Sequence, residues 1–269
     1  MAKYKKKRAR ELKQDKFRDT AMKLIDRVGD RLEGQGRPIL YGIGGVIIVV
    51  ALVWFFISWR NRRADEARLA LGRAITIAST PVSATPAAGS TTPSFATEQE
   101  RAQKAIDEFQ KVAARYGDPY RTEARYFIAA NLLYIDRNKG ISELTELTRS
   151  SNNEVATLSK FALAQAKEAD GKYDEAAALY GELSKQSSAV VTPETASLRL
   201  AMVYEKQGKK KEASDLLFNI ADAARKAKDA EGNPAAQSQA ARDAAQELQK
   251  LDPARYAQLT PEAPPNLAF

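Results

Sequence analysis

The most constraining feature of this sequence is an uninterrupted apolar stretch at residues 39–59, ILYGIGGVIIVVALVWFFISW, with 21 residues and no charged side chain. A helix of this length spans roughly 31 Å, which matches the hydrocarbon core of a bilayer. Pro38 suits the first turn of such a helix. Tyr41 would lie near one membrane interface, and Trp54 and Trp59 near the other. Because a buried helix of a soluble core rarely carries apolar residues on every face, the sequence predicts a transmembrane helix at 39–59.

The same stretch does not fit a cleavable signal peptide. It is longer than the usual apolar region of such peptides, 38 residues precede it, and Ser58-Trp59-Arg60 is a poor cleavage site. We therefore expect the segment to remain as an anchor.

Basic residues are concentrated before the apolar stretch. Residues 1–38 hold 13 Lys and Arg against 6 acidic residues, whereas residues 39–269 hold 29 against 28. The cluster from Lys3 to Arg10 favours a cytoplasmic N-terminus, because basic residues on a short flank tend to stay inside. The twenty residues on each side of the stretch hold four and five basic residues, so the local count leaves the opposite orientation open.

A basic amphipathic helix is expected between Gln14 and Leu32. Its apolar face comprises Phe17, Ala21, Leu24, Ile25, Val28 and Leu32, and its basic flank comprises Lys13, Lys16, Lys23, Arg27 and Arg31. This arrangement favours a helix that lies on anionic lipid headgroups. Nucleic-acid binding is not expected, since the tail lacks interleaved aromatic stacking groups.

The composition argues against catalysis. The chain has no histidine and no cysteine, which removes the commonest general base, the thiolate nucleophile, the usual zinc ligands and any disulfide. Acidic pairs such as Glu143 and Glu146, or Asp174 and Glu175, have basic neighbours and are typical of solvated helix surfaces. No phosphate loop or nucleophile elbow is recognisable. We therefore expect no enzymatic activity, no catalytic residues, no cofactor and no metal.

A helix is predicted at 60–78, through Ala64, Ala67, Leu71 and Ile75. It is followed at 79–97 by a flexible insertion with nine Ser or Thr, three prolines and no charge. The insertion is either a stalk or a loop within the first helical hairpin. We prefer the loop, because the preceding helix has an apolar stripe that needs a partner.

Residues 98–250 alternate helical blocks with short Gly, Asn or Asp breaks, and no run predicts a β-strand. The predicted blocks are approximately 100–116, 120–136, 140–150, 154–170, 173–186, 193–207, 210–228 and 234–250. Thr192 followed by Pro193 and Glu194 is a strong helix start. The last segment, 251–269, contains four prolines and is predicted to be a disordered tail.

Two stretches within this region are related. LAQAKEADGKYDEAAALYGEL at 163–183 and LAMVYEKQGKKKEASDLLFNI at 200–220 align without a gap at an offset of 37 residues. This pattern resembles the tetratricopeptide repeat, which has small residues where two helices cross and a glycine at the turn between them. The matching scaffold positions are Ala164, Gly171, Tyr173, Ala176, Tyr180 and Leu183 in one copy, and Ala201, Tyr204, Gly208, Ala213, Leu217 and Ile220 in the next. The expected fold is therefore all-α: a transmembrane helix followed by a tetratricopeptide-like α-solenoid of antiparallel helix pairs.

The whole layout resembles the ancillary SecYEG translocon subunit (YfgM-like) family of bacteria. That resemblance implies a single-pass inner-membrane protein with a cytoplasmic tail and a periplasmic repeat domain. It also implies the SecYEG translocon and periplasmic chaperones as partners. The insertion at 79–97 departs from the family pattern.

In such repeats the first helix of each pair lines a groove that binds segments of partner proteins. The family's groove positions fall here at Phe161, Gln165, Glu168, Leu198, Met202, Glu205 and Lys206. The other interpretation is that some of them pack against a neighbouring helix or the C-terminal block. The function expected from the resemblance is a membrane-anchored interaction scaffold of the bacterial envelope. The alternative is an adaptor that faces the cytoplasm and recruits soluble proteins.

Overall fold

The computed structural model describes residues 36–83 and 94–262, with only the backbone for 36–41 and 43. The predicted basic tail and its amphipathic helix therefore lie outside the described residues, as do most of the 79–97 insertion and residues 263–269. The chain divides between Ala64 and Asp65 into two compact units, and this boundary falls within the first described helix.

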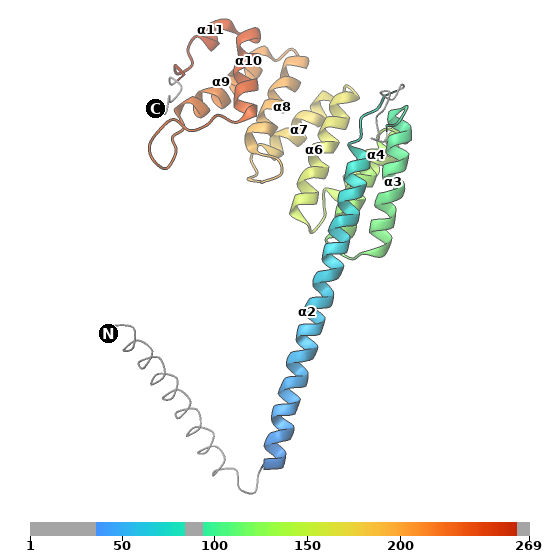
Figure 1. Cartoon of the computed structure of the whole chain (residues 1–269). Coiled ribbons are helices and arrows are strands. Elements are labelled where there is room, and N and C mark those ends of the chain that lie inside the picture. Colours follow the sequence, from blue (N-terminus) through green and yellow to red (C-terminus); the bar gives the residue numbers. More distant parts are fainter. Residues whose placement is uncertain (1–35, 84–93, 263–269) are drawn as a thin grey trace, which may run out of the picture. The chain divides into compact units, whose positions relative to one another are not determined.

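The described part of the chain is helical, which confirms the predicted all-α class. Its only β-type pairings are two isolated bridges, between Val82 and Phe95 and between Lys228 and Pro234. The helices are α2 (Gly36–Ala78), α3 (Glu98–Arg115), α4 (Tyr120–Leu132), α5 (Arg137–Leu147), α6 (Asn153–Ala169), α7 (Tyr173–Leu183), α8 (Pro193–Lys206), α9 (Lys210–Lys226), α10 (Gln239–Leu251) and α11 (Pro253–Tyr256) (Figure 1).

The first unit contains the part of α2 that precedes Asp65. Its large apolar side chains between Val46 and Trp59 are 47% to 71% exposed, so no other described helix covers them. α2 is long and apolar enough to cross a membrane, and none of its most apolar stretch is buried. Burial in a lipid phase removes the cost of leaving such side chains in water.

In the second unit, the last turns of α2 pack against α3. Ala67, Leu71 and Ala74 of α2 form one hydrophobic cluster with Phe109 and Val112 of α3. These three residues recur every three to four positions, so they lie on one face of the helix. The insertion at 79–97 thus joins two helices that pack in one cluster. This arrangement fits the predicted loop within a helical hairpin, whereas a stalk would join segments that do not pack together.

The ends of this insertion meet. The Ser83 amide donates a 2.9 Å hydrogen bond to the carbonyl oxygen of Phe95. Just beyond, the Thr97 side chain accepts from the Glu100 amide and begins α3 as an N-cap. The predicted start at Thr192 is confirmed in the same way, because its hydroxyl accepts from the Thr195 amide and Pro193 occupies the first turn.

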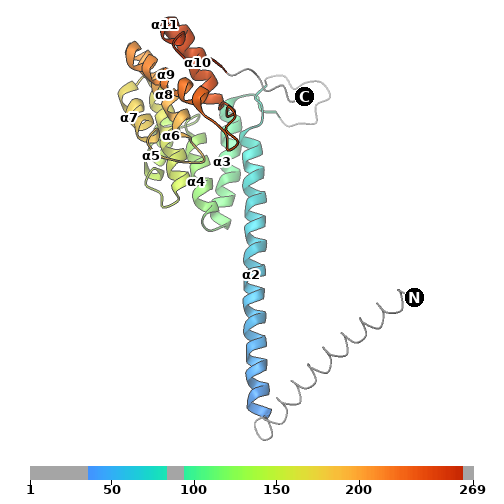
Figure 2. The same cartoon turned by 90° about the vertical axis from the view of Figure 1, so that its left-hand side faces the viewer.

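From α3 onwards each helix packs against its neighbours in sequence. Figures 1 and 2 show α6, α7, α8 and α9 following one another side by side. The hydrophobic clusters share helices: one joins α4, α5 and α6, the next joins α6, α7 and α8, and the last joins α8, α9 and α10. The core is therefore a continuous row of small clusters.

Two glycines make the turns within the related stretches. Gly171 ends the α6–α7 turn with φ of +71°, and Gly208 occupies the corresponding position between α8 and α9 with φ of +75°. Side chains with a Cβ rarely adopt this left-handed conformation, so the predicted role of both glycines is confirmed.

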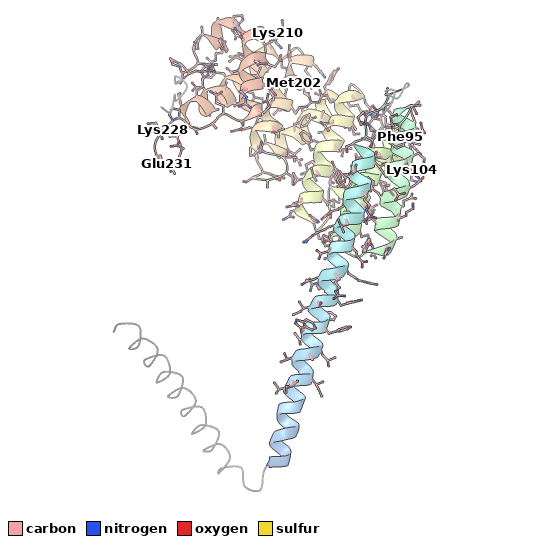
Figure 3. The ribbon with its side chains drawn as sticks, viewed as in Figure 1. Phe95, Lys104, Met202, Lys210, Lys228 and Glu231 are labelled. Atoms are coloured by element: carbon pink, nitrogen blue, oxygen red, sulfur yellow. The ribbon has the colours of Figure 1, made fainter. Side chains whose placement is uncertain are left out.

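The boundary before α10 differs from the prediction. Helix was expected at 234–250, but α10 begins at Gln239, where the Ser238 hydroxyl accepts from the Ala241 amide. Residues 227–238 form an irregular connection with Lys228 and Glu231 on its exposed part (Figure 3). Gly232, with φ of +84°, makes a turn that lets Pro234 pair with Lys228 in an isolated bridge, so residue 234 belongs to this bridge and not to a helix.

The prediction of a disordered tail from residue 251 is wrong for residues 251–262. Asp252 caps the short helix α11, and Leu259 is only 7% exposed within the α8–α9–α10 cluster. Thr260 then donates through its amide and hydroxyl to Asp222 Oδ1 on α9, at 3.1 and 2.7 Å. Pro253 occupies the first turn of α11, so this proline starts a helix and does not prevent packing. We call residues 252–262 the C-terminal strap.

Candidate functional site

The predicted scaffold positions occupy the interior of the helical array. Ala164, Ala176, Tyr180, Ala201, Ala213, Leu183, Leu217 and Ile220 are buried, whereas Tyr173 and Tyr204 are half-buried at the edge of the α6–α7–α8 cluster. The alanines are fully inaccessible because the helices cross where they lie. These residues hold the helices that carry the predicted groove.

The first groove residue, Phe161 on α6, faces inward. Its ring meets the Tyr180 ring edge to face, with centroids 5.7 Å apart, and it packs against the α6–α7–α8 cluster. Gln165, one turn further along α6, is exposed. Only Gln165 of this pair therefore offers its side chain freely to a partner.

Glu168 lies at the centre of a buried polar group. Its side chain is 5% exposed, and it accepts hydrogen bonds from Tyr180 at 3.1 Å, from Arg199 at 2.7 Å and from Lys206 at 2.8 Å. These donors come from α7 and α8, so one carboxylate links three helices. We call Glu168, Tyr180, Arg199 and Lys206 the Glu168 cluster.

The electrostatics of the cluster favour a charged carboxylate. Burial alone would raise the pKa of Glu168, but the hydrogen bond from Lys206 and the charge of Arg199 outweigh burial and hold this pKa below its usual value. Burial raises the pKa of the Tyr180 hydroxyl to about 12, so Tyr180 stays a neutral donor. Both carboxylate oxygens of Glu168 are engaged in this ion-pair network, whereas the buried Nε of Arg199 has no hydrogen-bond partner among the described residues.

The groove residues of α8 are largely covered by the chain itself. Leu198 is 8% exposed and belongs to the α8–α9–α10 cluster, where Ala241 and Ala244 of α10 also lie. Met202 packs against the same cluster (Figure 3). The second interpretation, packing against the C-terminal block, is therefore correct for these two residues.

The remaining predicted groove residues on α8 are Glu205 and Lys206, and both are exposed. Lys206 is 46% exposed but directs its ammonium group to Glu168. The predicted set is thus not brought together as one open groove, because Glu168 and Leu198 are buried. Gln165 and Glu205 are the members with freely exposed side chains.

A cleft that the sequence did not indicate lies between two turns, after α5 and after α7. It has a volume of about 520 Å³. Ser, Thr and Asn side chains dominate its lining, and its charged residues are Arg149 and Lys160. Such residues are common in turns, so the sequence gives no sign that these two turns form a cleft.

A second cleft, of about 440 Å³, surrounds the two glycine turns. Tyr173, Asp174 and Lys209 are among its lining residues, and Gln207 closes one side by donating a 2.8 Å hydrogen bond to Asp174. Both clefts present hydrogen-bonding groups, but the charged residues of the first are basic only, whereas the second has acidic and basic residues. Within residues 36–83 and 94–262, no group of three or more acidic side chains is arranged to hold a metal ion.

Comparison with protein-family models, with curated proteins and with solved structures finds no match to this chain. The class therefore follows from the fold: within residues 36–83 and 94–262 the protein is helical, and one of these helices is long and apolar enough to cross a membrane.

Proposed function

We propose that this protein is a membrane-anchored interaction scaffold of the bacterial envelope. Its N-terminus is cytoplasmic, its helical domain is periplasmic, and it assists the Sec translocon or periplasmic chaperones. One observation carries the proposal: α2 combines an apolar stretch that no described part of the chain covers and, after Asp65, a face that packs into the helical domain. An anchor of this kind raises the local concentration of the domain near other membrane proteins, so that weak contacts suffice.

We also propose that the domain is a tetratricopeptide-like solenoid. Gly171 and Gly208, 37 positions apart, make equivalent left-handed turns. Ala164 and Ala201 are fully buried at equivalent positions of α6 and α8, and Ala176 and Ala213 at those of α7 and α9. Such matched small residues and turns support repeated helix pairs.

The proposed partner surface is the exposed part of the predicted groove, around Gln165 on α6 and Glu205 on α8. A photo-reactive amino acid at either position in the full chain, irradiated in intact membranes, tests it. We expect crosslinks to the same partner from both positions and none from Glu231 on the exposed 227–238 connection. Identical products from all three positions, or no product from Gln165 and Glu205, would overturn this surface.

The cytoplasm-facing adaptor remains the second proposal, because exposed Arg60, Arg62 and Arg63 directly follow the apolar stretch. The sequence has no cysteine, so Ser187→Cys introduces a single thiol at an exposed position. A membrane-impermeant maleimide should label this thiol in spheroplasts if the domain is periplasmic. Labelling only after lysis would reject the periplasmic orientation and favour the adaptor.

A further inference from the structure

Three arginines directly follow the apolar stretch of α2. Arg60, Arg62 and Arg63 are exposed, and within the described residues none of them has an acidic partner. The nearest acids are already paired. Asp65 lies 3.6 Å from Arg68, and Glu66 lies 3.4 Å from Arg115. We call Arg60, Arg62 and Arg63 the arginine collar.

The collar occupies one half of the helix circumference. At 3.6 residues per turn, Arg62 and Arg63 point about 200° and 300° around the axis from Arg60, so the three side chains lie within an arc of about 160°. The headgroup layer encloses a membrane-spanning helix, so charged side chains at this depth reach headgroups from whichever side they occupy.

The depth of the collar also fits the headgroup layer. Trp59 ends the apolar stretch, and tryptophan prefers the border between hydrocarbon and headgroups. The collar residues follow Trp59 by one to four positions, a rise of roughly 1.5 to 6 Å. The headgroup region is about 5 to 7 Å thick on each side of the bilayer. Arg73 follows by fourteen positions, or roughly 21 Å, and lies beyond this layer.

The collar is linked to the interfacial tryptophan. The guanidinium carbon of Arg63 lies 4.7 Å from the centre of the Trp59 ring. A cation above an aromatic face is held by the ring quadrupole, and its outward N–H groups stay free to bind an acceptor. Trp59 therefore positions Arg63 at the membrane border with donors available.

The residue type points to a phosphate ligand. The chain has no lysine between residues 38 and 103, so every basic residue near the domain-side end of the stretch is arginine. The planar guanidinium donates two parallel hydrogen bonds to a phosphate, whereas an ammonium group acts as a point charge. Three arginines without an acidic partner among the described residues are therefore suited to phosphodiesters.

We infer that the arginine collar binds the phosphate groups of anionic lipids in the leaflet next to the helical domain. This inference rests on the proposed membrane anchoring, and it concerns the opposite end of the helix from the basic tail. The collar would hold anionic lipid against this side of α2. It would also account for basic residues on the side of the membrane where an exported domain usually has fewer.

The two tryptophans of the sequence, Trp54 and Trp59, make the test direct. Trp54→Phe leaves Trp59 as the single reporter beside the collar. The full chain is reconstituted in vesicles of phosphatidylcholine and phosphatidylglycerol, with dibrominated acyl chains on one lipid or the other. Brominated chains quench a tryptophan that they touch. We expect about threefold preferential quenching by the anionic lipid at equal mole fraction.

Variants then assign the preference to the collar. The triple variant Arg60→Gln, Arg62→Gln, Arg63→Gln should lose it, whereas the control Arg73→Gln on the same helix should keep it. The triple lysine variant keeps the charge but not the paired donors, so we expect it to lose part of the preference. An unchanged preference in the glutamine variant would overturn the inference, and an unchanged preference in the lysine variant would overturn paired phosphate binding.

The same data separate this inference from the proposed anchoring. If neither brominated lipid quenches Trp59, the helix is not in the bilayer and the anchoring itself fails. If both lipids quench Trp59 equally, the helix is inserted and only the collar's lipid binding fails. Quenching by brominated phosphatidylcholine also verifies that each variant remains inserted.

Discussion

The Glu168 carboxylate on α6 and the Arg199 guanidinium on α8 lie 2.7 Å apart, although 31 residues separate them in the chain. The helix between them, α7, contributes the Tyr180 hydroxyl to the same carboxylate. The contact therefore ties one related stretch to the next. It combines with the apolar clusters to set how these three helices pack.

Glu168→Ala should destabilise the helical domain by about 3 kcal/mol, because it leaves Arg199 and Lys206 without their buried partner. Urea unfolding of the full chain in detergent, followed by circular dichroism at 222 nm, measures this change. Glu175→Ala is the matched control, since the Glu175 side chain is 53% exposed where it pairs with Lys167. Equal losses for both variants would show that the Glu168 cluster is not a special contact.

Stability should fall as the pH drops from about 4 to about 2, in part through Asp222. The hydrogen bond from Lys226 and those from Thr260 lower the pKa of this carboxyl from 3.8 to about 2. The unfolded chain therefore binds the proton at higher pH than the folded chain, so the stabilisation is complete above pH 4 and is lost towards pH 2.

Asp222→Asn should reduce the free energy of unfolding at neutral pH. It should also make this free energy depend less on pH between about 2 and 4. Urea midpoints measured between pH 2 and pH 6 test both effects. If the urea midpoint changes equally with pH in Asp222→Asn and in the unaltered protein, Asp222 does not cause the loss of stability in acid.

Gly140→Ala should destabilise the α4–α5 packing by about 1–3 kcal/mol. A Cβ at this position would lie 2.8 Å from the backbone nitrogen of Leu133, and backbone atoms do not move aside easily. Gly72→Ala on α2 is the control, because nothing lies within 4 Å of its added Cβ. The control should gain about 0.5–1 kcal/mol from better helix propensity, so the two substitutions should differ in sign in thermal unfolding.

Gly171→Ala and Gly208→Ala should each cost about 1–2 kcal/mol, since both glycines have φ above +70° and an added Cβ strains that conformation. Gly181→Ala serves as the helical comparison, because its added Cβ would make only an ordinary 4.0 Å contact with Leu200. A cost at Gly181 as large as at the two turns would contradict the role of backbone conformation. Denaturant midpoints of the three single variants decide the matter.

Features set by local chemistry were predictable from the sequence. The exposed apolar stretch that ends at Trp59, the helix start at Thr192 and the turns at Gly171 and Gly208 each depend on a few adjacent residues. The burial of Ala176 followed from its place in the repeated pattern. These elements reflect rules that act within one or two helical turns.

The site was less predictable, because it depends on which distant segment covers a given face. An apolar residue such as Leu198 is suited equally to a partner protein or to the chain's own α10, and the sequence does not distinguish them. Glutamate is usually found at the protein surface. Glu168 is buried because three helices meet around it, which the sequence alone does not reveal. The structure around Pro253 was also not predictable, because the sequence does not distinguish a proline that begins a helix from one in a disordered segment.

The C-terminal strap has a consequence for assembly. Leu259 packs into the α8–α9–α10 cluster, and Thr260 and Glu262 pair with Asp222 and Arg225 on α9. A row of stacked helices ends in a face that could accept the first helix of another copy, and repeated contacts of that kind build open-ended filaments. Here the chain's own last described residues occupy that face, which disfavours head-to-tail growth.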